Sequence, residues 1–89
     1  MELTTNRLAI IIDDGAVYTD DFYFINLDLS DFGIPPEVWA LQWKDGTGEI
    51  EFRDNSHNQI INELPAWALR CYELHQSIPR EVVEDPGSV

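Results

Sequence analysis

The sequence is poor in basic residues, with five Lys and Arg against seventeen Asp and Glu, and its formal net charge at pH 7 is -12. A surface of this charge repels phosphate, so the composition disfavours direct binding of nucleic acid or of an anionic membrane. Basic surfaces of other proteins are the natural electrostatic partners of such a chain. The same charge also keeps a small protein soluble.

Cysteine is nearly absent, since Cys71 is the only one in the chain. A single cysteine excludes an internal disulfide and any cysteine-rich metal site, and it fits a reducing compartment. The sequence also lacks an apolar run of about 18 residues, the length that a membrane-spanning helix needs. Residues 1–7 lack the charged and apolar regions of a signal peptide, so we expect a cytosolic protein.

The chain does contain enough apolar residues for one core, since 44% of its 89 residues are hydrophobic and 11% are aromatic. A chain of this length has room for one domain, which we expect to span residues 1–89. The charged end of the sequence, residues 80–89, is expected to be a frayed tail.

Two apolar runs near the start predict a hairpin. Residues 8–12 form a continuous apolar run, Asp13-Asp14-Gly15 is typical of a tight turn, and residues 16–18 follow as a short partner strand. In the next segment, residues 22–29, the side chains are expected to point alternately to the two faces of a strand. One set of positions is apolar and is expected to face the core, namely Tyr23, Ile25, Leu27 and Leu29, while Phe22, Phe24, Asn26 and Asp28 are expected to face outward.

A second hairpin is predicted over residues 38–52, where two strand-like runs flank Lys-Asp-Gly-Thr-Gly. Residues 54–59 are polar and are expected to form an exposed loop. Pro65 suits the first position of a helix that ends before Pro79. Its apolar stripe comprises Trp67, Ala68, Cys71, Leu74, His75 and Ile78.

This order of elements predicts the α+β class, with a small antiparallel sheet of about four or five strands, a meander of hairpins, and one C-terminal helix packed on it. The tryptophans could anchor a partner, but in a chain this small we expect them to build the core. The predicted core comprises Ile10, Ile12, Trp39, Leu41, Trp43, Ile50, Phe52, Trp67, Cys71 and Leu74.

The sequence lacks motifs typical of catalytic or metal-binding sites. The acid pairs at Asp13-Asp14 and Asp20-Asp21 do not have the spacing of an EF-hand, and neither His57 nor His75 belongs to a zinc motif. We expect His57 to be exposed and His75 to pack in the helix. The sequence therefore predicts no cofactor, no metal site and no catalytic residue, and it gives no support for an enzyme.

The acidic charge leaves two interpretations open. It can keep the protein soluble, or it can mimic the phosphate track of nucleic acid, as an inhibitor of a host nucleic-acid-binding defence protein would. Mimicry requires acids in two rows on one exposed face. The candidate acidic surface residues are scattered along the sequence: Asp13, Asp14, Asp20, Asp21, Asp28 and Asp31.

The order of several short motifs resembles small proteins encoded among the tail genes of tailed bacteriophages and prophages. The matching positions are Ile34, Pro35, Val38 to Trp43, Gly48 to Phe52, Ile61, Leu64, Pro65 and Trp67 to Leu69, within about residues 33–69. The resemblance implies a non-enzymatic protein of the tail module that accompanies tail-fibre assembly, like a chaperone, or stays as a small virion component. The resemblance implies no catalytic residue in this chain.

From this resemblance we expect a protein partner, a phage tail or tail-fibre polypeptide, and a location in the cytoplasm of the bacterial host or in the virion tail. An exposed strand edge or aromatic face would make the contact. Tyr18, Phe22 and Phe24 are the candidate contact residues, because the alternation places both phenylalanines opposite the expected core set. The alternative function is the acidic inhibitor of a basic host protein.

Overall fold

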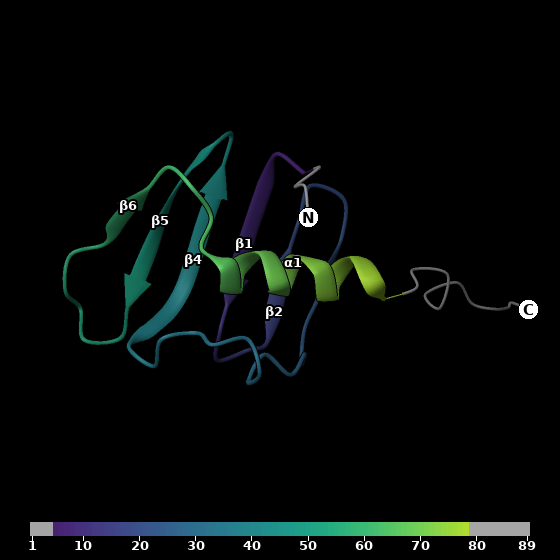
Figure 1. Ribbon diagram of the computed structural model, residues 1–89, viewed down its shortest axis with the longest axis horizontal. Helices are drawn as coiled ribbons and strands as arrows, with labels where there is room; N and C mark the ends of the chain where they lie inside the picture. The colour runs from purple at the N-terminus through teal and green to yellow at the C-terminus, as the bar shows by residue number, and fades with distance from the viewer. Residues whose placement is uncertain (1–4, 79–89) are drawn as a thin grey trace, which may run out of the picture.

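A computed structural model describes residues 5–78 as one antiparallel sheet with a helix packed on it (Figure 1). The elements are β1 (Arg7–Ile11), β2 (Ala16–Tyr18), β3 (Tyr23–Phe24), β4 (Val38–Lys44), β5 (Thr47–Phe52), β6 (Gln59–Ile61) and α1 (Ala66–Ser77). The predicted α+β class is confirmed, with six strands in this part of the chain. The predicted frayed tail, residues 80–89, lies outside the described residues.

The sheet joins two three-stranded meanders, and its strand order is β3-β2-β1-β4-β5-β6. The junction is the antiparallel pair of β1 and β4, in which Arg7 lies across from Lys44 and Ile11 from Ala40. The long connection between β3 and β4 carries the chain from one meander to the other. This topology leaves β3 and β6 as the two edge strands of the sheet.

Helix α1 lies across one face of the sheet, over β4, β1 and β2 (Figure 1). Pro65 precedes the first turn with extended backbone angles, φ -66° and ψ 158°, which suits a residue that has no amide hydrogen to donate. The buried residues of the helix recur at steps of one, three and four positions, namely Trp67, Ala68, Cys71, Tyr72 and His75. We refer to the side of the sheet away from α1 as the uncovered face.

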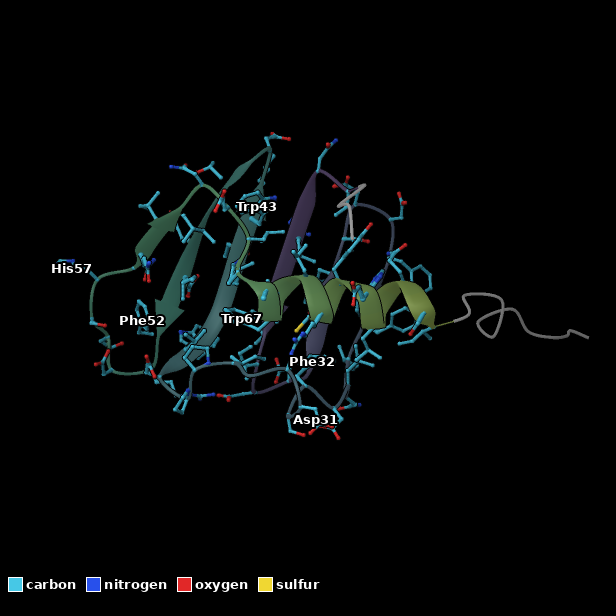
Figure 2. All side chains as sticks on the ribbon, viewed as in Figure 1. Asp31, Phe32, Trp43, Phe52, His57 and Trp67 are labelled. Atoms are coloured by element: carbon cyan, nitrogen blue, oxygen red, sulfur yellow. The ribbon has the colours of Figure 1, made fainter. Side chains whose placement is uncertain are left out.

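Most of the predicted core residues lie between the sheet and α1. Those that are buried are Ile10, Leu41, Trp43, Ile50, Trp67 and Cys71, and those that are partly buried and pack against this cluster are Ile12, Phe52 and Leu74. Figure 2 labels two of the indole rings, Trp43 on β4 and Trp67 at the start of α1. Each of these two tryptophans is 8% exposed, so both contribute to the core.

Trp39 differs from the prediction, because it is half-buried and lies outside the core cluster. The pairing of β4 with β5 shifts between Val38 and Ala40, which makes Trp39 the extra residue of a β-bulge. A bulge places two residues of one strand opposite one residue of its partner, and this breaks the strict alternation of side chains. The bulge accounts for the position of Trp39 outside the core cluster.

The alternating segment after β2 also differs from the prediction. Tyr23 is 57% exposed and Ile25 is 51% exposed, whereas Phe22 and Phe24 are half-buried. The cause is Asn26, whose positive φ of 61° interrupts the extended backbone. A break of this kind reverses which alternate residues face the core. After Asn26, the two residues that were predicted to face the core do so: Leu29 is buried and Leu27 packs against the core.

The sixth strand was not expected from the sequence. Residues 54–58 form an exposed loop, as predicted, but Gln59 begins β6 and pairs with Ile50 of β5. His57 lies in this exposed loop, far from α1 (Figure 2). Ile60 is 64% exposed on β6, so this edge of the sheet carries a single large exposed hydrophobic side chain.

Candidate functional site

The outer edge of β3 is an exposed apolar feature of the sheet. It carries two of the three exposed large hydrophobic side chains described, Tyr23 and Ile25. A hollow of about 560 Å³ follows this edge and is lined by Asp21, Phe22, Tyr23, Phe24 and Ile25. We call residues 21–25 the β3 edge. An apolar strand edge that no other strand covers can pair with another chain.

A short turn between β2 and β3 fixes the geometry of this edge. The amide of Thr19 donates to the carbonyl oxygen of Phe22 over 2.9 Å, and the Thr19 hydroxyl donates to the same oxygen over 3.2 Å. Tyr18 then lies directly across from Tyr23. Their rings stack on the uncovered face, with centroids 5.2 Å apart and planes 18° from parallel. The stack restrains the exposed ring of Tyr23.

On the other side of the sheet, α1 supports the β3 edge through His75. The imidazole is fully buried and its Nε2 lies 3.2 Å from the carbonyl oxygen of Phe22. The ring also meets Phe24 edge-on, with centroids 5.1 Å apart. The expectation that His75 packs in the helix is therefore met, and the packing links the C-terminal part of α1 to the edge strand.

The three predicted contact residues are not brought together on one surface. The ring of Tyr18 lies on the uncovered face, where the Arg7 guanidinium lies 6.0 Å from its centroid. The rings of Phe22 and Phe24 contact each other at 5.1 Å, but both residues are half-buried and Phe24 packs on the helix.

The exposed hydrophobic residues of the edge are instead Tyr23 and Ile25, which sequence reasoning assigned to the core. The signal that could have located them is Asn26, because asparagine is one of the few residues that adopt a left-handed backbone readily.

All six predicted acidic surface residues are exposed: Asp13, Asp14, Asp20, Asp21, Asp28 and Asp31. They occupy three separate segments, which are the turn before β2, the turn after β2 and the connection to β4. Figure 2 shows Asp31 on that connection. The acids thus lie in turns at opposite ends of β2, and they do not follow the strands in two rows.

Local partners lower the pKa of two of these carboxylates, and a third, Asp20, accepts a hydrogen bond of 2.7 Å from the Asn6 amide. Arg53 donates a hydrogen bond of 3.0 Å to Asp13 and forms an ion pair with it at 2.7 Å, and this contact lowers the pKa of Asp13. The amide and the hydroxyl of Ser30 donate to Asp28, and these bonds lower the pKa of that carboxyl. Both acids therefore stay ionised well below neutral pH.

A second hollow, of about 370 Å³, lies on the uncovered face where β1, β4 and β5 meet. Its lining includes the cross-strand neighbours Arg7 and Lys44, together with Glu49 and the exposed side chain of Ile60. Two like charges directly across a strand pair repel each other. The lining of this hollow thus contains two bases and one acid.

Within residues 5–78, no three His, Cys, Asp or Glu side chains come together as a metal-binding group would require. The thiol of Cys71 is fully buried, and this burial raises its pKa to about 12. A thiol of this kind stays protonated at neutral pH and behaves as a small apolar side chain.

Comparisons of the chain with family models, with curated proteins and with solved structures found no match. Over the described residues, no helix has the length and apolar character needed to cross a membrane.

Proposed function

We propose that this protein acts by binding another polypeptide, and that the partner is a tail or tail-fibre polypeptide of a tailed bacteriophage. The protein holds this partner during assembly or remains with it as a small tail component. The observation that carries the binding role is the β3 edge, where Tyr23 on a terminal strand and Ile25 just after that strand expose apolar side chains. Exposed strand edges are common docking points for a segment of another protein.

The phage setting rests on the resemblance of residues 33–69 to small tail-module proteins. That segment runs from the connection before β4 to the first turn of α1 and includes the buried Trp43 and Trp67. The resemblance thus indicates the class of partner. The β3 edge is not part of residues 33–69, and it provides the proposed contact surface.

The acidic inhibitor is the second candidate, because a net charge of -12 favours a basic partner surface. The dependence of affinity on salt separates the two functions. A contact made through apolar side chains and main-chain hydrogen bonds weakens little as salt rises, whereas a contact made mainly between charges weakens steeply.

The test is co-expression of this chain with each tail and tail-fibre polypeptide encoded in the same genome, followed by size-exclusion chromatography at low and high salt. We expect a complex with one of these polypeptides that persists at high salt. The proposal fails if none of them binds and a host nucleic-acid-binding protein binds instead in a salt-sensitive way. Mass spectrometry of purified virions then separates an assembly helper, which is absent, from a tail component, which is present.

A further inference from the structure

The main-chain groups of β3 alternate between β2 and the free edge of the sheet. Thr19 donates its amide hydrogen to Phe22, and Phe24 pairs with β2 two residues later. In an antiparallel pair, the residues between such hydrogen-bonded positions turn their N–H and C=O groups away from the partner strand. Tyr23 therefore presents both groups to the free edge, and the same alternation directs those of Ile25 there.

The side chains of the same residues can accept the side chains of an added strand. Tyr23 and Ile25 are exposed by more than half, and the hollow beside them is lined mainly by apolar residues. The edge is held from both sides of the sheet, by the stacked ring of Tyr18 and by the buried ring of His75. A pre-organised edge loses little conformational entropy when it binds.

Carboxylates flank the β3 edge at both ends. Asp20 and Asp21 lie in the turn at its start. Asp14 lies beside its other end, because the Asn26 amide donates to the Asp14 carbonyl oxygen over 3.0 Å, and Asp28 follows two residues later. All four acids are exposed. An added strand of about five residues, roughly 16 Å long, would reach from one acidic end to the other.

These four carboxylates are free of ion pairs with the described bases, since the ion pair found in residues 5–78 joins Asp13 to Arg53. Arg7 lies over the ring of Tyr18, on the uncovered face and not along the strand edge. Both ends of the edge therefore carry uncompensated negative charge, which favours a partner with positive charge at the matching ends.

A second copy of this chain does not meet that requirement. Antiparallel pairing of two β3 edges would bring Asp20 and Asp21 of one copy toward Asp14 and Asp28 of the other, and like charges across a strand pair are destabilising. The net charge of -12 on each copy adds to the repulsion. Charge complementarity thus selects a different protein.

We propose that the β3 edge binds, as an added antiparallel strand, an extended segment of a partner protein that has apolar residues at alternate positions and Lys or Arg at both ends. This inference rests on the proposed polypeptide-binding function and names its site and the chemistry of its partner. Main-chain hydrogen bonds to Tyr23 and Ile25 supply the affinity, the hollow accepts alternate side chains, and the flanking acids set the register.

The test uses a labelled peptide, Lys-Lys-Val-Thr-Val-Thr-Val-Lys-Lys, and two versions of it that are N-methylated at alternate sets of central residues. One methylated set removes the amides that face the edge, and the other removes those that face away. We expect the parent peptide and one methylated version to bind, and the other to bind about tenfold or more weakly, since it loses main-chain hydrogen bonds. Equal binding of both methylated peptides, or no binding of the parent peptide, overturns the proposal.

Two protein variants locate the site. Ile25→Asp places a charge in the hollow, and we expect it to abolish peptide binding, whereas the matched change Ile60→Asp on the other edge strand should leave binding unchanged. Amide resonances of residues 21–26 should shift on titration with the parent peptide. If Ile60→Asp abolishes binding, or if the amide chemical shift changes map to β6, the proposed location of the binding site is wrong.

The charge requirement has its own control. Replacing the four peptide lysines by glutamates should weaken binding through repulsion, and Asp20→Asn with Asp21→Asn should weaken binding of the basic peptide only modestly, because main-chain hydrogen bonds supply most of the affinity. A tail polypeptide that is captured equally well by the Ile25→Asp protein would refute this edge while leaving the proposed function standing. Capture of no tail polypeptide, together with strand-like binding of the basic peptide, would refute the phage setting alone.

Discussion

The imidazole of His75 joins the end of α1 to the turn before β3. Its Nε2 lies 3.2 Å from the carbonyl oxygen of Phe22, and its Nδ1 lies 2.9 Å from the side-chain nitrogen of Gln76. Each ring nitrogen thus lies within hydrogen-bond distance of a polar group, one of the main chain and one of a side chain. Because the ring is fully buried and also packs on Phe24, it is the link through which the helix stabilises the β3 edge.

Replacing that ring should therefore loosen the edge strand. We expect His75→Ala to lower the free energy of unfolding by ~2–4 kcal/mol, because it removes a buried side chain and a hydrogen bond. Glu73→Ala, an exposed change on the same helix, is the control and should stay within ~0.5 kcal/mol of the parent. Urea denaturation measures both. Hydrogen exchange at Thr19 and Phe24, whose amides face the β2–β3 pairing, should accelerate in the His75 variant, and unchanged exchange there would contradict this link.

The two tryptophans of β4 should differ in their contributions to stability. Trp43 is 8% exposed and packs in the core, so Trp43→Ala should cost ~3–5 kcal/mol. Trp39 is half-buried at the bulge, and Trp39→Ala should cost only ~1–2 kcal/mol because less apolar area is lost from the interior. Thermal and urea denaturation give both values. Equal losses would mean that the bulge does not separate the two rings.

Gly48 on β5 lies against the ring of Trp43, its cross-strand neighbour. A Cβ atom at this position would lie 2.5 Å from the carbonyl oxygen of Gln42 and 2.9 Å from Cε3 of Trp43. We expect Gly48→Ala to destabilise the protein by ~1–3 kcal/mol through overpacking. Glu49→Ala, at the exposed neighbouring position, is the control. A Gly48→Ala protein with the stability of the parent would show that β4 and β5 can move apart at no cost.

Cys71 should report on the docking of α1. Burial raises the pKa of its thiol to about 12, so at pH 8 it should react with iodoacetamide far more slowly in the native protein than in urea. Native reactivity equal to that of the unfolded chain would show that the helix does not protect it.

The same thiol should also make stability depend on alkaline pH. In the unfolded chain it ionises near its ordinary pKa of 9.0, whereas in the fold it ionises near 12. Ionisation thus favours the unfolded chain as pH rises from 9 toward 12, and has no effect below 9. At pH 10 the parent should lose about 1 kcal/mol more stability, relative to pH 8, than Cys71→Ala does. Equal losses would contradict the pKa shift.

The sequence by itself determined the elements whose pattern is local and strong. The continuous apolar run before Gly15 predicts β1, the alternation of Ile50 and Phe52 predicts β5, and the stripe bounded by Pro65 predicts α1. These patterns fix the α+β class, because strands and a helix with one apolar face each must bury those faces against one another. Burial of Trp43, Trp67 and Cys71 follows from the same patterns.

Only the tertiary structure decided which residues reach the candidate site. One left-handed residue, Asn26, reversed the faces of the segment before it, and this exposed Tyr23 and Ile25 where the alternation alone had placed them inside. A one-residue bulge left Trp39 outside the core cluster, and pairing with β5 made a strand of residues 59–61, which carry no strong strand pattern. The physical reason is that side chains in a strand alternate with a period of two, so a single irregular residue moves its neighbours to the other face.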